Sequence, residues 1–349
     1  MRIGAIPESP AEFVVTRMNL APLPLIETQM AYTLARVVMV GVKLGVFEAL
    51  KDGPGTTPHV ATQCGTDPAA TGKLLFALAG SGYLKQQGDA YELTTITRKW
   101  LVEGSSHSLV DKLLFQFLEW DFVERSEDYV RTGQPLEMHS NEMPAEHWDL
   151  YQRGMRAMAS GISAEAVKRI PVPKGATRML DIGGSHGYYS VALCRRYDGL
   201  TSQILDLPAA VEQAAPILAA ENMGDTVVHR AGNALTDDLG IEQYDLVLVA
   251  QLVHHFSDEQ NRELAQRIAA ALRPGGVFAI MDEFRPGTVK SAGQFGALLE
   301  FFFALTSQSG TWAVDEIADW QRAAGLRPRK PISLLTAPGI GIQAATKPR

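Results

Sequence analysis

"MLDIGGSHGYYSVAL", residues 179–193, decides the fold, because a strand, a glycine-rich loop and a helix follow one another in it. The apolar residues before Asp181 predict a buried strand that ends at this acid. Gly183, Gly184 and Gly187 let the backbone pass close to a ligand at the end of that strand. The segment therefore predicts the ligand-binding turn of an open α/β sheet.

Strands and helices alternate in the chain after this turn. Helical segments cover 208–222 and 258–272, and the tail 331–348 predicts two more strands at a sheet edge. Such alternation is typical of a parallel, doubly wound sheet. We therefore predict an α/β fold with a doubly wound, mostly parallel sheet. Its main strands are predicted at Arg178–Ile182, Ser202–Asp206, Thr226–Ala231, Tyr244–Ala250 and Val277–Asp282.

The N-terminal region has a different pattern. Residues 27–51 form a helix that is apolar nearly all round, which is typical of a helix buried against a partner. Polar residues followed by Pro58 and Pro68 predict two helix starts, and 83–94 predicts a hairpin. Together these elements predict a winged helix that forms a dimer. The second of its helices offers only Lys73 as a cation, too few for phosphate contacts, so we expect no nucleic-acid binding.

Composition and charge narrow the class further. The chain has 349 residues, 46% hydrophobic and 20% charged, with a net charge of −7. This acidic balance disfavours a nucleic-acid or anionic-membrane surface. Two cysteines without ligand spacing predict neither a disulfide framework nor a metal cluster. We find no signal peptide or membrane span, and we predict a cytoplasmic protein.

Three regions follow from these patterns. We predict a helical, winged-helix dimerisation domain over 1–105, a helical segment over 106–170 that forms part of a substrate pocket, and a cofactor-binding domain over 171–349. Two prolines and a glycine at 171–175 mark the last boundary.

The glycine loop also discriminates between cofactors. No register of it gives the G-x-G-x-x-G pattern of dinucleotide-binding proteins. It matches the pattern acidic-x-G-x-small-x-G instead, which suits S-adenosylmethionine. The acid, Asp181, favours the cationic amino-acid end of that cofactor. Asp206 at the end of the second strand can accept both ribose hydroxyls, and Gly232 and Asn233 follow the third strand, where an amide can meet adenine.

With these motifs the chain resembles the class I S-adenosylmethionine-dependent O-methyltransferases that act on plant phenolics and bacterial polyketides. The resemblance rests on "DIGGSHG", "LDLP", "GNAL", "HHFSD" and "MDEFRP", and it covers nearly the whole chain. Ser185 and Asn233 depart from the family pattern. The resemblance implies a homodimer and a set of cofactor-binding residues: Asp181, Gly183, Gly184, Gly187, Asp206, Leu207, Gly232, Asn233 and Ala234.

Aligned on "SD" of "HHFSD", the family's catalytic base is His254. A phenol titrates near pH 10 and an imidazole near 6.5, so the imidazole can act as a general base while the oxygen attacks. The family supports this base with two acids. The first corresponds to Asp282, and we find no second acid in 307–312. A purely structural role for this turn remains the alternative.

We expect an aromatic small molecule as the acceptor. Tyr151, Met155, Met158 and Ile162 lie on one helix face, which is typical either of core packing or of a pocket wall for a flat apolar ligand. No cluster of hard oxygen ligands predicts a metal. Two other functions stay open: a fold relative that catalyses hydroxylation, decarboxylation or a pericyclic step, and a cofactor-sensing regulator on DNA. The candidate acceptor-binding residues are Phe115, Trp120, Tyr151, Met155, Met158 and Phe303.

Overall fold

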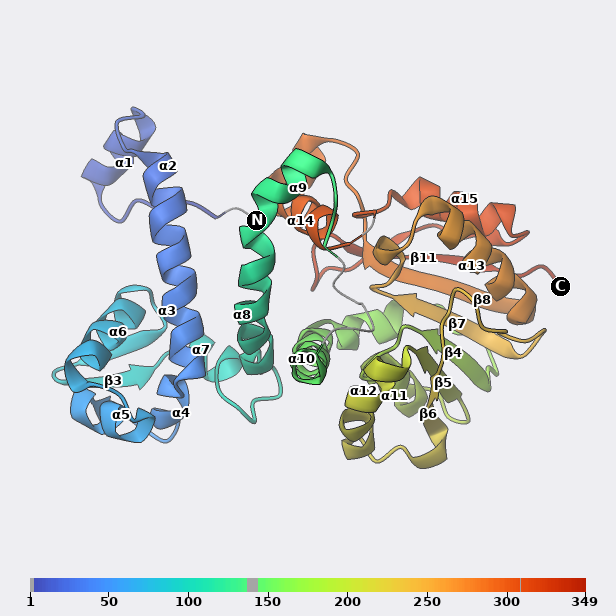
Figure 1. The fold of residues 1–349 in the computed structure, drawn as a ribbon, viewed down its shortest axis with the longest axis horizontal. Helices are drawn as coiled ribbons and strands as arrows, with labels where there is room; N and C mark the ends of the chain where they lie inside the picture. The colour runs from blue at the N-terminus through green and yellow to red at the C-terminus, as the bar shows by residue number, and fades with distance from the viewer. Residues whose placement is uncertain (1–2, 137–143, 308) are drawn as a thin grey trace. The chain divides into compact units, whose positions relative to one another are not determined.

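The computed structural model describes residues 3–136, 144–307 and 309–349. The chain forms two compact units, Met1–Phe117 and Leu118–Arg349, and the division falls inside helix α8 (Val110–Glu124). Figure 1 shows the elements of both units.

The N-terminal unit is mainly helical and contains a small sheet of order β1-β3-β2. Asp67 caps the helix that follows it by accepting a hydrogen bond from the Ala70 N–H at 2.8 Å, and Pro68 stands in the first turn. The predicted pair of helices and the hairpin are both confirmed. The elements are α1 (Pro10–Arg17), α2 (Leu23–Leu25), the π-helix η1 (Ile26–Met30), α3 (Ala31–Lys43), α4 (Val46–Ala49), β1 (Gly55–Thr56), α5 (Thr57–Cys64), α6 (Pro68–Gly80), β2 (Leu84–Gln87), β3 (Ala90–Leu93) and α7 (Thr95–Trp100).

Helices α1 to α3 carry much of their apolar surface on the outside of this unit. Phe13 is 62% exposed and Met30 is 50% exposed. By length and composition alone, the helical stretch Leu23–Lys43 could cross a membrane, with 22% of its apolar window buried, which the sequence prediction did not anticipate. An exposed apolar patch of this kind is also typical of a protein–protein interface.

The C-terminal unit is built on one sheet with the order β10-β11-β8-β7-β4-β5-β6, and β9 pairs with β11. Strands β4 to β8 pair in parallel, whereas β11 runs antiparallel to β8. The predicted doubly wound, mostly parallel sheet is confirmed, and the tail supplies its edge. The strands are β4 (Arg178–Ile182), β5 (Thr201–Asp206), β6 (Val227–Ala231), β7 (Tyr244–Ala250), β8 (Leu272–Glu283), β9 (Arg327–Pro328), β10 (Ile332–Ser333) and β11 (Ile340–Thr346).

Helices cover both faces of this sheet (Figure 1). One core cluster joins Met179, Leu248 and Met281 to residues of α10 and α11. The other joins their strand neighbours, such as Leu180 and Val249, to α13 and α15. The alternation of side chains along each strand thus separates the two cores. The helices are α9 (Ser126–Thr132), α10 (Ala145–Arg169), α11 (Tyr188–Arg196), α12 (Pro208–Ala220), η2 (Gly224–Thr226), η3 (Val253–His255), α13 (Asp258–Ala271), α14 (Val289–Thr306) and α15 (Val314–Ala323).

Gly187, the last glycine of the 183–187 loop, lies where the turn packs closely against the core. Gly187 has φ +75°, and a Cβ there would lie 2.7 Å from Cδ1 of Ile204. Gly199 has a similar φ of +80°, but a Cβ there would meet nothing within 4 Å. We expect Gly199→Ala to cost about 1–2 kcal/mol for the left-handed backbone alone. Gly187→Ala should cost at least about 1 kcal/mol more, because it also overpacks the core. Urea unfolding of both variants measures the difference, and equal losses would contradict the close approach.

Candidate active site

Asp181 lies at the end of β4, under the glycine loop. Its side chain is buried, with 1% of the residue exposed, and Oδ2 accepts a hydrogen bond from Ser190 Oγ at 2.6 Å. Oδ1 has no hydrogen-bond partner among the described residues. Burial raises the pKa of this carboxyl to about 7, and the nearby Asp206 adds to the increase. A group of this kind can bind a cation, because the cation favours its ionised form.

The loop backbone packs directly against this acid. A Cβ on Gly184 would lie 2.5 Å from Cγ of Asp181, and one on Gly183 would lie 2.7 Å from Leu252 Cδ2. Gly183 also has φ +68°. Both positions therefore require glycine for space, and Gly183 requires it for conformation as well.

Ser185, the departure from the family pattern, is held by three different elements. It has φ +54°, and its N–H donates to Oδ2 of Asp206 at 2.8 Å. Its hydroxyl donates to Oε1 of Gln152 on α10, and its carbonyl accepts from His229 Nε2 on β6 at 2.9 Å. A non-glycine residue in the left-handed region costs free energy, and these contacts stabilise it there.

Asp206 lies where β5 ends. Besides the Ser185 N–H, it accepts the Leu207 N–H at 2.8 Å through Oδ1. Burial raises its pKa to about 6, although both backbone hydrogen bonds oppose the increase. The N-cap residue of the next helix, α12, is Leu207.

The third strand end lies next to the second. The Gly232 N–H donates to the Asp206 carbonyl at 2.8 Å, which joins the turn after β6 to the end of β5. Asn233 accepts the Leu235 N–H through Oδ1 at 2.9 Å, so Nδ2 is its remaining polar group. Arg267 Nη1 donates to the Ala234 carbonyl at 2.7 Å. The structure thus brings the candidate residues of three strand ends to one edge of the sheet.

His254 lies in η3, just after β7, and it is 3% exposed. Its Nδ1 hydrogen-bonds to Oδ1 of Asp282 at the end of β8, at 2.8 Å. The ring of Phe303 on α14 lies 4.6 Å from the imidazole centroid. Because Nδ1 is used by the carboxylate, Nε2 is the nitrogen that can take a proton.

Sequence reasoning missed the residue that fixes the histidine turn. Asn261 on α13 is buried, and its Nδ2 donates to the carbonyls of Val253 and Phe256, at 3.0 and 3.2 Å. One amide thus satisfies two carbonyls on either side of His254. The sequence contained no signal for this role, because an Asn inside an amphipathic helix is usually solvated.

Further acids lie near Asp282. Glu283 is 8% exposed, and burial raises its pKa to about 7, with added increases from Asp282 and Glu300. Glu300, on α14, accepts a hydrogen bond from the Thr311 hydroxyl. The segment 307–312 itself contains no acid, as the sequence shows, but α14 brings Glu300 into contact with it.

The predicted stripe on α10 is not the buried face of that helix. Tyr151 and Met155 are half-buried, and Met158 is 43% exposed. The buried face carries Trp148 and Gln152 instead. Ile162, the last residue of the stripe, packs against the core, and the role of Tyr151, Met155 and Met158 as a pocket wall stays a prediction. Gln152, which contacts the glycine loop, was missed because its polar side chain carries no periodic signal.

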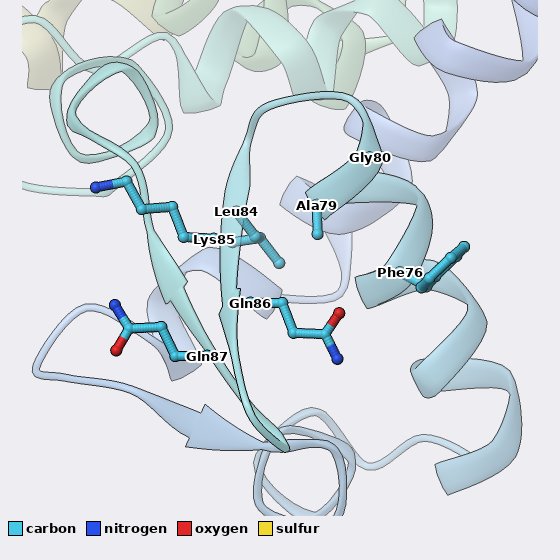
Figure 2. A pocket seen from close by; sticks show the side chains of 7 residues that line it. All are labelled: Phe76, Ala79, Gly80, Leu84, Lys85, Gln86 and Gln87. Atoms are coloured by element: carbon cyan, nitrogen blue, oxygen red, sulfur yellow. The ribbon is translucent and has the colours of Figure 1, made fainter.

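The other candidate residues lie in different surroundings. Trp120 on α8 is half-buried in the C-terminal unit, whereas Phe115 is buried in the N-terminal unit. The N-terminal unit also contains a hollow, and Figure 2 shows the residues that line it. It lies between α6 and β2, and none of the candidate residues lines it. Its lining is Phe76, Ala79, Gly80, Leu84, Lys85, Gln86 and Gln87.

The doubly wound sheet, the acid under the glycine loop and the second acid one strand away define the class of S-adenosylmethionine-dependent methyltransferases. Two family models match the chain: an O-methyltransferase domain over residues 125–314 and an O-methyltransferase dimerisation domain over residues 26–103. The chain belongs to this O-methyltransferase family and is an S-adenosylmethionine-dependent O-methyltransferase.

Individual relatives are distant. A 3-hydroxy-5-methyl-1-naphthoate 3-O-methyltransferase of Streptomyces sahachiroi is 24% identical over 88% of this chain and 90% of its own length. An N,N-dimethyltransferase, OxyT, of Streptomyces rimosus is 26% identical over 77% of this chain and 81% of its own. The crystal structure of human N-acetylserotonin methyltransferase in complex with its cofactor matches the fold, with a TM-score of 0.80, 18% identity and coverage of 99% and 100%.

The residues at the sheet edge fit this cofactor. Asp181 offers to an ammonium group an oxygen that has no partner among the described residues, and Gly184 places no side chain over its carboxyl. Asp206 can accept hydrogen bonds from ribose hydroxyls. The donor set therefore matches a ligand with a cationic amino-acid end and a nucleoside end.

The raised pKa of Asp181 predicts a pH-dependent affinity. Only the ionised carboxyl attracts the ammonium group, so binding should strengthen as pH rises through about 7. Between pH 6 and pH 8 the affinity for S-adenosylhomocysteine should rise roughly tenfold, following the ionised fraction. Calorimetry at each pH measures the change. Asp181→Asn should bind weakly with a flatter profile, and an unchanged profile in that variant would assign the titration to another group.

Proposed function

We propose that this enzyme methylates a phenolic hydroxyl of an aromatic small molecule, with His254 as the general base. The observation that carries the proposal is the 2.8 Å hydrogen bond between His254 Nδ1 and Asp282 Oδ1. It fixes the ring and leaves Nε2 as the proton acceptor.

Asp282 supports the base in two ways. Its Oδ1 also accepts the Glu283 N–H at 2.8 Å, so the carboxylate is held in place. Its negative charge favours the imidazolium that forms when the phenol proton moves to Nε2. S-adenosylmethionine, when bound, supplies an electrophilic methyl group. Transfer to a phenol releases one proton, and His254 takes it, which makes the oxygen a better nucleophile.

The acceptor wall is part of the same proposal. Phe303 packs against His254, so its ring is well placed to hold an aromatic acceptor beside the base. Tyr151, Met155 and Met158 supply a half-exposed face of α10, and aromatic and thioether groups suit a flat apolar ligand. Trp120, in the same unit, remains a proposed member of this wall, whereas Phe115 is buried in the N-terminal unit. The hydroxynaphthoate in the name of one relative supports an aromatic acceptor from secondary metabolism.

The base predicts a kinetic result. His254→Ala should lower kcat by roughly 10²–10⁴, the usual contribution of a positioned general base. Binding of S-adenosylhomocysteine should barely change, because the proposed adenosyl contacts lie on β4 to β6. Activity of the variant should recover as pH rises towards the pKa of the phenol. Release of S-adenosylhomocysteine with a panel of phenols and polyketides measures turnover.

Two variants serve as controls for this result. Asp282→Asn should show a milder loss, because the imidazole is still held but its charged form is less favoured. His255→Ala should lose much less activity, because the hydrogen bond to Asp282 is made by His254, although the two histidine ring centroids lie 4.1 Å apart. Near-full turnover in His254→Ala would reduce the "HHFSD" turn to a structural role.

We further propose a homodimer formed by the N-terminal unit, supported by the dimerisation model over 26–103 and by the exposed apolar residues of α1 to α3. An interface of this kind should bury more than roughly 2,000 Å². Light scattering at micromolar concentration should give twice the chain mass of 37.9 kDa. Phe13→Asp combined with Met30→Asp should lower that mass, while a monomer for the unaltered protein would refute the proposal.

A further inference from the structure

Gln152 is the most completely buried polar residue that touches the glycine loop. It is 0% exposed, and its Oε1 accepts a hydrogen bond from the Ser185 hydroxyl. Its Nε2 has no partner among the described residues. A buried donor without a partner costs free energy, so it calls for a bound group that accepts its hydrogen bond.

The Ser185 contact is made by the oxygen end of the Gln152 amide. The Ser185 N–H is bound to Asp206 and its carbonyl to His229, so the hydroxyl has little freedom to move. Because this hydroxyl donates to Oε1, the other atom of the amide is the donor Nε2. Gln152 therefore presents two N–H groups beside the 183–187 loop.

The charges around the loop indicate what these N–H groups bind. The amino-acid end of the cofactor carries an ammonium and a carboxylate. Asp181 attracts the first, but Asp181 and Asp206 both repel the second. Arg156, one turn further along α10, pairs with Glu221 at 2.5 Å, and Glu221 also pairs with Arg195 at 3.0 Å. Arg156 is therefore held at Glu221, whereas the Nε2 donor of Gln152 lies beside the loop without a partner among the described residues.

We propose that Gln152 Nε2 donates a hydrogen bond to the carboxylate of the methionine moiety of S-adenosylmethionine, with Ser185 as its positioning residue. This assignment rests on the proposed cofactor-binding residues and adds one that they do not include. It also gives a reason for the serine: a glycine at position 185 would lack the hydroxyl that orients the amide.

Two ligands that differ only at the amino-acid end test this proposal without turnover. S-adenosylhomocysteine carries the carboxylate, whereas 5′-methylthioadenosine has the nucleoside and the sulfur but no amino-acid group. Calorimetry of Gln152→Met should show roughly tenfold weaker binding of S-adenosylhomocysteine, the usual effect of one lost hydrogen bond to a charged group. Gln152→Glu should weaken it more, by charge repulsion. Neither variant should change the affinity for 5′-methylthioadenosine.

Matched variants separate the possible explanations. Ser185→Ala should weaken the binding of S-adenosylhomocysteine but not that of 5′-methylthioadenosine. The effect should be smaller than in Gln152→Met, because the amide remains but is no longer oriented. Ser163→Ala removes another buried polar group of α10 and should change neither affinity. Asp206→Ala should weaken the binding of both ligands, since both contain the ribose. If Asp206→Ala weakens neither, the proposed cofactor site itself fails.

Two results would overturn the proposal for Gln152. If Gln152→Met weakens the binding of both ligands equally, Gln152 only supports the loop. If the binding of both ligands is unchanged, Gln152 does not contact the ligand. Thermal unfolding of each variant establishes that it is folded. If Gln152→Glu does not fold, Gln152→Met and Ser185→Ala still decide the question.

Discussion

The buried carboxyl of Asp181 constrains the whole cofactor end of the molecule. A carboxyl that is 1% exposed and, among the described residues, hydrogen-bonded to Ser190 alone is a poor component of a core, unless a ligand completes its contacts. The loop above it must approach within the reach of its Cγ, so Gly184 cannot carry a Cβ. The position of the loop then fixes Ser185, and Ser185 in turn connects α10, β5 and β6. A single buried acid thus constrains Gly184 directly and Ser185 through the position of the loop.

The same sheet edge supports a second cluster with a different chemistry. His254 follows β7 and Asp282 lies near the end of β8, and the parallel pairing of these strands brings the two residues, 28 positions apart in the chain, to 2.8 Å. Parallel strands place all their carboxyl ends at one edge, so the proposed cofactor contacts and the proposed base come together without long loops. The turn that carries His254 is held by Asn261, Trp312 and Phe303, so its orientation does not depend on a ligand.

Much of this arrangement could be predicted from the sequence, for a physical reason. The loop, the strand-end acids and the histidine turn each lie within a short segment of the chain. Within such a segment the residue type itself indicates the local structure, as Gly187 indicates a positive φ. Gln152 and Glu300 could not be found in this way. Each comes from a helix, and its contact with the loop or with Thr311 depends on how that helix packs. The stripe on α10 shows the same limit: periodicity identified a face, but tertiary packing buried the other one.

The buried acids at this edge of the sheet also affect where positive charge is stabilised before and after methyl transfer. Asp181, Asp206 and Glu283 all have raised pKa values, because burial disfavours their ionised forms. A cationic ligand lowers those pKa values and gains affinity from doing so, whereas a neutral one gains less. The reactant cofactor carries a sulfonium charge and its product does not. A site of buried acids therefore binds the reactant more tightly than the product on electrostatic grounds. In the proposed mechanism, the proton that leaves the phenol moves to the His254 imidazole beside Asp282, so the positive charge stays at this edge of the sheet.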